Sequence, residues 1–455
     1  MLTDPLEITG VWWLPESPET EIAGTLRYSP EEGIILELIG SFHDITEMNA
    51  PREIPVVNGV AGGKNVTLTN LHTIRSNLQI PGVHLSTLRA RFAFVGNIFT
   101  SLDSIQFSSV SVAYLHLNAW LDAANIEISR PDNRTTTITV HLPEPARYEL
   151  REGFAISIVF SQAGPGWSRG SLEASVRQQA YVRFDRVQPA EYDAFVDSIR
   201  HFQHLLSLAV GRHCPPISLQ AAPSTTQDSH EPRQPLPSIE IIYQPVDPPD
   251  TRSRVISPQM FLPYHHVAPR LQDIFHRWFS AGDGLRTVFS LFFATKLASR
   301  MFLENRFLGL VQSMESFHRL TIAGTRLPED EFRSRLQTLS TSVSPELAEW
   351  LRASMMYANE KTLRTRLTEL VSQFPRLSAQ VLGGSPHATV SRVVDTRNYL
   401  THYDLATRDR AAVGTDLYRS IQQLTAFMHA SLIVYLGFNH TAAEDIVLGQ
   451  PDQLP

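Results

Sequence analysis

The stretch Asp395-Thr-Arg-Asn-Tyr-Leu-Thr-His-Tyr-Asp404 decides how the C-terminal half of the chain is interpreted. At about 100° per residue in an α-helix, Asp395, Asn398 and His402 fall on one stripe roughly 60° wide. Nearby apolar residues fall on a different face, which we expect to pack inward: Val390, Val393 and Leu400. The stretch therefore predicts a helix that presents carboxylate, amide and imidazole groups together.

The spacing of arginine and histidine in this stretch carries no information by itself. With 17 histidines in a chain whose basic residues are nearly all arginine, an Arg followed by a His after four to six residues should occur roughly four times by chance. Three such pairs occur: Arg397/His402, Arg270/His276 and Arg134/His141. Because Arg397 lies about 140° around the helix from His402, only its long side chain or a second copy of the protein brings both groups to one phosphate.

The complete string resembles the signature of HEPN domains, helical proteins many of which are metal-independent ribonucleases. That signature is an Arg, a polar residue (often Asn), three further residues and a His, as in Arg397 to His402, and an acidic residue two before the Arg is common, as at Asp395. The resemblance is strongest to the ApeA-like branch of bacterial phage-defence proteins. There the same run follows helices similar to Gln312–Phe317 and Lys361–Leu367. A fainter resemblance extends into the N-terminal half.

The residue types in the string suit RNA cleavage. RNA can be cut without a metal ion because its 2′-OH lies next to the scissile phosphate, so a base, an acid and a positive charge suffice. His402 can act as the base or the acid, Arg397 can hold phosphate oxygens in a forked contact, and Asn398 can orient the phosphate or the imidazole. The alternative is an exposed polar helix face without chemistry.

The resemblance also implies how such a site is completed. HEPN nucleases typically form their active cleft from two motifs that face one another in a dimer, so we expect a homodimer joined through the helical domains. Asp395 would then hold His402 or the partner subunit's Arg397. Glu315 is either a buried charge near the motif or an ordinary surface glutamate. Tyr399 and Tyr403 either stack on flanking bases of the RNA or pack within the helical domain.

Composition bounds the class of protein. A chain of 455 residues is too long for one ordinary core, and 42% hydrophobic with 19% charged residues indicates a globular protein of two or three domains. The formal net charge of −7 argues against a protein that coats nucleic acid non-specifically, although a local basic patch is enough to bind one scissile phosphate. The single cysteine, Cys214, excludes an intramolecular disulfide and suits a reducing cytoplasm.

No targeting or membrane segment is expected. The N-terminal residues lack the basic start and apolar run of a signal peptide. The most apolar window, Leu285–Phe293, is too short to span a bilayer. We therefore expect a cytoplasmic protein without a membrane partner, and we expect it to need no cofactor.

Residues 1 to about 187 are predicted to be β-structure. Apolar residues alternate with polar or small ones along 154–161, 138–142 and 182–185, which is typical of half-buried strands. Ser29–Gly33 is a credible hairpin turn. Many short strands of this kind predict an antiparallel β-sandwich-like or barrel-like domain.

The pattern then changes twice. A helix with an apolar stripe is predicted from Pro189 to about Arg212, and the following 215–259 is rich in proline and resembles a linker with one short strand at Ser238–Tyr243. Helices dominate from about Met260. The predicted architecture is α+β multidomain: a β-rich domain at 1–214 that ends in a helix, a linker at 215–259, and an all-α HEPN helical bundle at 260–445.

Other sites have weaker support. The side-chain types of a metal site occur at His201, His204, His213 and Cys214, but no recognisable ligand spacing completes them. Gly59–Lys64 is glycine-rich but lacks the Gly-Lys-Ser/Thr ending of a phosphate-binding loop. Trp12-Trp13 is either a binding platform or, more commonly, a pair with at least one ring in the core.

The leading hypothesis is a metal-independent HEPN endoribonuclease that binds RNA and acts in antiviral defence by abortive infection. The resemblance implies that the β-rich half senses infection, through a phage-derived trigger, or restrains the nuclease. It also leaves tRNA as one candidate substrate. The alternative is a non-catalytic HEPN scaffold that only dimerises and carries a ligand-binding β-domain.

Overall fold

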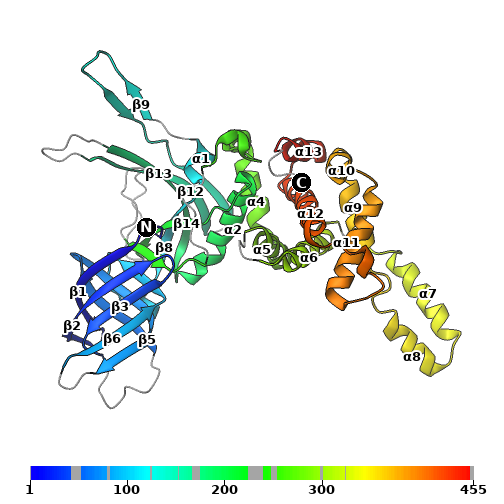
Figure 1. Ribbon diagram of the computed structural model, residues 1–455, viewed down its shortest axis with the longest axis horizontal. Coiled ribbons are helices and arrows are strands. Elements are labelled where there is room, and N and C mark those ends of the chain that lie inside the picture. Colours follow the sequence, from blue (N-terminus) through cyan, green and yellow to red (C-terminus); the bar gives the residue numbers. More distant parts are fainter. Residues whose placement is uncertain are drawn as a thin grey trace. The chain divides into compact units, whose positions relative to one another are not determined.

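The chain folds into two compact units in a computed structural model, Met1–Phe279 and Ser280–Pro455 (Figure 1). The structure describes residues 2–42, 53–78, 82–122, 126–151, 153–166, 175–223, 239–246, 254–297, 301–322 and 324–450. The first unit is β-rich and the second is helical.

Six antiparallel strands of the first unit close into a barrel. Their order is β6-β3-β2-β1-β4-β5, and pairing of β5 with β6 completes the ring. These strands form because apolar residues alternate with less buried ones along the chain. In β3, for example, the side chains of Ile34, Leu36 and Leu38 are buried and point to one side of the sheet. The strands are β1 (Leu6–Leu14), β2 (Ser17–Ser29), β3 (Gly33–Ile39), β4 (Glu53–Ala61), β5 (Lys64–Leu78) and β6 (His84–Ala90).

Tight turns and one close contact shape the barrel. The predicted turn is confirmed, since Ser29 pairs with Gly33, whose φ is +82°. The glycine-rich stretch is also a hairpin turn: Gly62 and Gly63 have φ of +57° and +74° between the paired residues Ala61 and Lys64, as two-residue hairpins require. Trp12 is fully buried, so it is a core residue and not a binding platform.

A seven-stranded extension continues from the barrel. From β5 the order is β7-β15-β14-β8-β13-β12-β11. The β-rich, antiparallel prediction is therefore confirmed, whereas the sandwich-like arrangement is corrected to a closed barrel with added strands, because β5 pairs with β4, β6 and β7. The added strands are β7 (Phe92–Val95), β8 (Phe107–Tyr114), β11 (Ala146–Arg151), β12 (Phe154–Gly166), β13 (Ser175–Ala190), β14 (Pro216–Pro223) and β15 (Ile239–Tyr243).

Part of the stretch predicted as a linker belongs to this sheet. Strand β14 pairs with β8, and β15 pairs with β7 and β14. Prolines stand at both ends of β14, where they remove few hydrogen bonds from the ladder. The polar run 224–229 lies outside the described residues.

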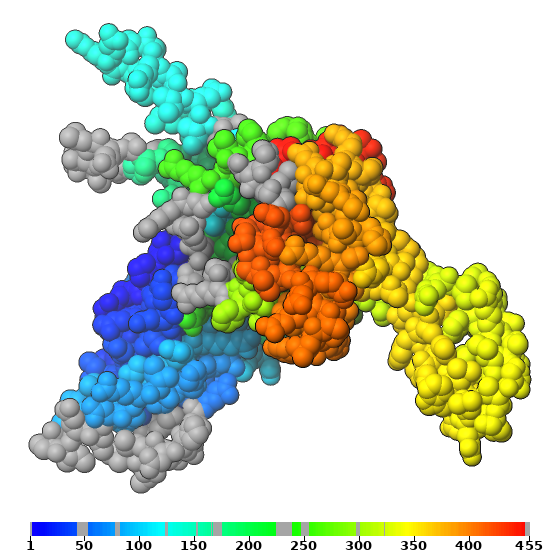
Figure 2. All heavy atoms as spheres, turned by 45° about the vertical axis from the view of Figure 1, so that its right-hand side comes forward, coloured from blue at the N-terminus to red at the C-terminus, as the bar shows by residue number. Residues whose placement is uncertain are grey.

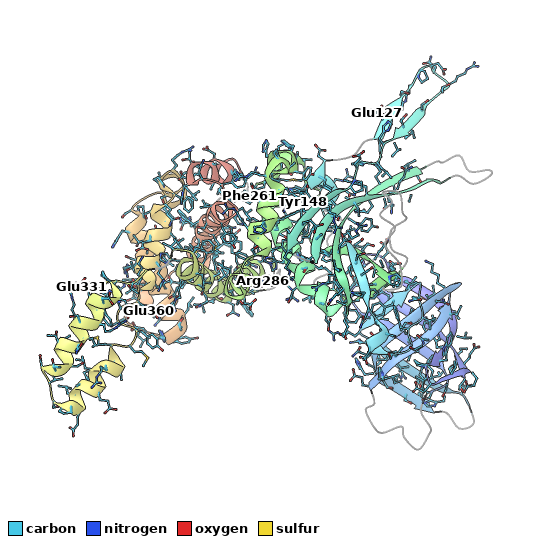
Figure 3. All side chains as sticks on the ribbon, turned by 180° about the vertical axis from the view of Figure 1, so that it is seen from behind. Glu127, Tyr148, Phe261, Arg286, Glu331 and Glu360 are labelled. Carbon is cyan, nitrogen blue, oxygen red and sulfur yellow. The ribbon has the colours of Figure 1, made fainter. Side chains whose placement is uncertain are left out.

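Helices cover the extension. Helix α2 (Asp193–Val210) packs on β8 and β13 with the predicted apolar stripe buried, although Pro189 belongs to β13 and not to the helix. The short helices α3 (Tyr264–Val267) and α4 (Leu271–Phe279) also lie in the first unit. Tyr148 of β11, labelled in Figure 3, meets Phe275 of α4 edge-on with ring centres 5.1 Å apart.

The second unit is helical, as predicted. Helix α12 lies at its centre and packs against α6 and α13, with buried residues on most of its surface. Within the described residues, no helix is both long and apolar enough to cross a membrane. The helices are α5 (Asp283–Leu297), α6 (Leu303–Thr321), α7 (Glu329–Thr341), α8 (Pro345–Ser354), α9 (Leu363–Ser372), α10 (Pro375–Leu382), α11 (Pro386–His402), α12 (Gly414–Tyr435) and α13 (His440–Leu448).

Helices α7 and α8 form a hairpin that extends away from the other helices of this unit (Figures 1 and 2). Ser344 caps α8 by accepting a hydrogen bond from the backbone N–H of Leu347, as a helix N-cap should. Of the residues in these two helices, only Ala348 is buried. Glu331 lies on this hairpin, and Glu360 lies where the chain returns to the other helices (Figure 3).

Candidate active site

The motif occupies the last two turns of α11. The helix is continuous from Pro386 to His402, so Arg397, Asn398 and His402 have the helical spacing that the sequence predicts. Pro386 stands at the first turn, where a proline is tolerated. The helix ends because Tyr403 adopts a left-handed conformation with φ of +51°, and its N–H bonds the carbonyl of Tyr399 at 2.8 Å.

A buried threonine anchors this end of the helix. Thr396 is fully buried; its Oγ1 donates to the carbonyl of Arg392 at 2.7 Å and accepts from the backbone N–H of Ala412 at 2.8 Å. Val390 and Val393 are buried on the same helix. Thr396 was not among the predicted site residues, although it follows Val393 by three positions and therefore lies close to the buried valine face of the helix.

Helix α11 packs against α6, α9 and α10. A side-chain hydrogen bond from Arg364 of α9 to Ser391 of α11 joins two of these helices. Helix α9 carries most of the run Lys361–Leu367, and α11 carries the motif from Asp395 to His402. The motif therefore sits on a helix that is held on several sides, and its last turn is left at the surface.

The three candidate catalytic residues differ in exposure. His402 is exposed, whereas Arg397 and Asn398 are half-buried. The Arg397 guanidinium donates from Nη1 to Asn398 Oδ1 at 3.2 Å. No hydrogen bond or ion pair between His402 and Arg397 or Asp395 is present among the described residues, so one subunit by itself does not assemble an acid–base pair.

Asp395 has a partner that the sequence analysis did not name. Its Oδ2 lies 3.1 Å from Nε of Arg410, in a short 3-10 turn at Arg408–Arg410 that follows the helix. The Asp395 side chain is 16% exposed and that of Arg410 is 63% exposed. The carboxylate therefore lies beneath a guanidinium that faces solvent, and it does not contact His402.

The two tyrosines lie one helical turn apart. Their ring centres are 6.0 Å apart in an edge-on arrangement. Tyr399 is half-buried, but 76% of Tyr403 is exposed, so packing within the helical unit does not account for the Tyr403 ring.

Glu315 belongs to an ion-pair network on α6. Its side chain is mostly buried, and its Oε1 lies 4.0 Å from Nη2 of Arg319, which also lies 2.8 Å from Glu360. The structure thus makes Glu315 a paired, part-buried charge. None of its described ion pairs or hydrogen bonds is to a residue of α11.

A second polar cluster joins α6 to α9 next to that network. Fully buried His318 contacts Glu369 Oε2 through Nε2 at 2.7 Å, and Nζ of Lys361 donates to the same oxygen at 2.8 Å. Arg366 approaches His318 Nδ1 at 3.4 Å. Because a guanidinium only donates, Nδ1 accepts and Nε2–H donates to Glu369.

The pKa values of His318 and Glu369 are both shifted downward, which fits a neutral His318 that donates from Nε2 to an ionised Glu369. Burial lowers the pKa of His318, although Glu369 acts in the opposite direction. For Glu369, burial opposes ionisation, but hydrogen bonds from Lys361 and His318 outweigh it and hold the pKa of the carboxyl below its usual value. The cluster is therefore a structural link between the helices that support α11.

The residues considered for a metal site have other contacts. His201 stacks on Trp278 and its Nε2 lies 2.7 Å from the Trp278 carbonyl, while His213 contacts Gln203 at 2.8 Å. Among the described residues, no three His, Cys, Asp or Glu side chains converge as metal ligands would.

Two family models match the chain. The model described as ApeA N-terminal domain 1 matches residues 7–278, and the model described as Apea-like HEPN matches residues 308–442. The first covers the β-rich unit, and the second covers the helices from α6 to the start of α13. No curated protein and no solved structure matches the chain.

Proposed function

The chain belongs to the ApeA family and carries an ApeA-like HEPN domain, and from this premise we propose that it is a metal-independent endoribonuclease that defends bacteria against phage. The observation that carries the proposal is the end of α11, where Arg397, Asn398 and His402 share one anchored helix and the imidazole is exposed. These groups supply the charge and the proton transfer that RNA cleavage needs.

In the proposed reaction, the 2′-oxygen of a ribose attacks the adjacent phosphorus while a base removes its proton. The bond from phosphorus to the 5′-oxygen breaks, and an acid protonates that oxygen. The products end in a 2′,3′-cyclic phosphate and a 5′-OH. His402 is the base or the acid, and Arg397 neutralises the charge that develops on the phosphate oxygens.

Two subunits would complete the site. One subunit has no contact between His402 and Arg397 among its described residues, and the two lie about 140° apart around the helix. A homodimer in which two α11 ends face each other would bring the guanidinium of one subunit to the imidazole of the other. Two histidines in one cleft could also divide the acid and base roles.

The N-terminal unit is proposed to regulate the nuclease. Its closed barrel and extension have no residues that we assign to RNA chemistry. We propose that this unit senses a phage-derived trigger or restrains the helical unit until infection, and that tRNA is a candidate substrate.

The test is RNA cleavage by the purified protein in EDTA, with tRNA among the substrates and with extract of infected cells to supply a trigger. The matched variants are His402→Ala and His387→Ala, since His387 is also exposed but lies on the first turn of α11. We expect cleavage that leaves 2′,3′-cyclic phosphate ends, lost by about 10²–10⁴-fold in His402→Ala and kept in His387→Ala.

Intact RNA under all of these conditions would contradict the proposal and favour the alternative, a scaffold in which the HEPN domain only dimerises. Cleavage that survives in His402→Ala would assign the activity to other residues. Cleavage that EDTA abolishes would contradict metal independence alone.

A further inference from the structure

Arg410 lies outside α11, in the segment that follows it, and its guanidinium is ion-paired to a residue of that helix. Its partner Asp395 falls with Asn398 and His402 on one stripe roughly 60° wide. The ion pair between Arg410 Nε and Asp395 Oδ2, at 3.1 Å, thus places the guanidinium over that stripe.

The segment that carries Arg410 is fixed in place. The chain turns back after Tyr403, and Ala412 is tied to the buried Oγ1 of Thr396 at 2.8 Å. Thr407 is also buried and its Oγ1 donates to the carbonyl of Asp404 at 2.8 Å. Arg410 is therefore held beside α11 by the backbone as well as by its ion pair.

The arrangement of the two charges would let an anion bind to the Arg410 guanidinium. Asp395 is 16% exposed and Arg410 is 63% exposed, so the positive group is the outer one. Asp395 is the only ion-pair partner of Arg410 among the described residues. A guanidinium held this way has lost part of its side-chain freedom before a phosphate arrives, which lowers the entropic cost of binding.

Resting on the proposed nuclease function, we propose that Arg410 binds a phosphate of the RNA other than the scissile one, and that Asp395 is its positioning residue. Asp395 precedes His402 by about two helical turns, or ~10 Å along the axis. A phosphate at Arg410 is thus displaced from the reacting one along the strand. Arg410 would contribute to RNA binding and register and not to the bond-breaking step.

The proposal predicts a loss in binding and not in turnover. Removal of one phosphate contact from a single strand lowers the slope of log Kd against log salt by about 0.7 to 1. We expect Arg410→Gln to weaken RNA binding about 3- to 10-fold at low salt and to reduce the slope by that amount. Arg410→Lys should keep the slope, because it keeps the charge.

A control arginine of matched exposure is Arg335, whose side chain is 62% exposed and paired with Glu331 on the α7–α8 hairpin. Arg335→Gln should leave RNA binding unchanged. Asp395→Asn keeps an oxygen that can accept from Arg410 Nε but removes the negative charge. The positioning contact is therefore retained, and a phosphate contact at Arg410 predicts RNA binding equal to or tighter than that of the parent. A purely structural ion pair predicts the same defect as in Arg410→Gln.

The experiment measures binding of a fluorescein-labelled single-stranded oligoribonucleotide by anisotropy between about 50 and 200 mM salt. All variants are made in the His402→Ala background with EDTA present, so cleavage does not interfere. Binding that is weaker, with a shallower slope, in Arg410→Gln alone supports the proposal. The same Kd and slope as in Arg335→Gln overturn it, whether or not the wild-type protein cleaves RNA. No RNA binding by any variant overturns both proposals.

Steady-state kinetics then test whether the Arg410 contact contributes to RNA binding or to the bond-breaking step. In the active background, Arg410→Gln should raise KM with kcat changed less than about 2-fold, as expected for a contact made equally in ground and transition states. A fall in kcat with unchanged KM would instead place Arg410 at the reacting phosphate and contradict the assignment.

Discussion

Thr396 accepts a hydrogen bond from the backbone N–H of Ala412 at 2.8 Å, and this contact joins the motif helix to the segment that returns alongside it. The hydroxyl is fully buried and also donates to the carbonyl of Arg392. One side chain inside the motif string therefore fixes both the helix end and the segment that carries Arg410.

Thr396→Val should destabilise the protein without changing the size of the buried side chain. The substitution leaves the N–H of Ala412 buried without its acceptor, which costs about 1–3 kcal/mol. Thermal unfolding of the variant should show the loss, whereas Thr401→Val, exposed on the same helix, should unfold like the wild type. Equal stability of Thr396→Val and wild type would show that the contact does not hold the segment.

Tyr403→Asn should separate the role of the backbone from that of the ring. Asn tolerates the left-handed conformation that Tyr403 adopts at φ of +51° better than an aromatic residue does, so the melting temperature should hold or rise. RNA binding should weaken by about 1–3 kcal/mol if the ring stacks on a base.

The matched control is Tyr357→Asn, because Tyr357 is 71% exposed and Tyr403 is 76% exposed. Fluorescence anisotropy with a labelled oligoribonucleotide measures the RNA affinity of both variants. An RNA affinity in Tyr403→Asn equal to that of Tyr357→Asn would leave Tyr403 as a helix cap only.

The β-rich unit should lose stability in mild acid through His204. Burial, reinforced by the charges of His201 and Arg200, lowers the pKa of His204 to about 3. The unfolded chain binds a proton near pH 6.5 and the folded one does not, so stability is full above that pH and falls as the pH drops from 6.5 toward 3.

At about pH 5 this linkage amounts to about 2 kcal/mol for one histidine whose pKa falls from 6.5 to about 3 on folding. His204→Gln, which does not titrate there, should show a smaller drop in melting temperature between about pH 7.5 and pH 5 than the wild type does. Parallel pH profiles for the two proteins would refute the assignment of the acid sensitivity to His204.

The sequence predicts local features of this protein well. The helix that holds the motif follows from the spacing of Val390 and Val393, and the hairpin turn at Ser29–Gly33 follows from its turn residues. The helical second unit also follows from its apolar periodicity. Each of these features depends on residues close together in the chain.

Features set by distant contacts could not be predicted in the same way. The barrel closes because β5 pairs with β6, and the extension begins where β5 also pairs with β7. The sequence of a single strand does not reveal which other strand it pairs with. The proline-rich stretch conceals β14, because its prolines lie at the strand ends. Asp395 contacts Arg410 in the same returning segment that the Thr396–Ala412 hydrogen bond joins to the helix, and helical spacing predicts neither contact.

The central claim is that two subunits pool Arg397 and His402 to cleave RNA, and mixing two inactive variants tests it most directly. In a heterodimer of Arg397→Ala and His402→Ala, one composite site regains an intact arginine and histidine while the other site loses both. After subunit exchange, we predict RNA cleavage at about a quarter of the wild-type rate, since about half of the dimers are mixed and each has one intact site. Mixing Arg397→Ala with the double variant Arg397→Ala/His402→Ala should restore nothing. If the mixture of the two single variants stays as inactive as each variant alone, the shared site is contradicted.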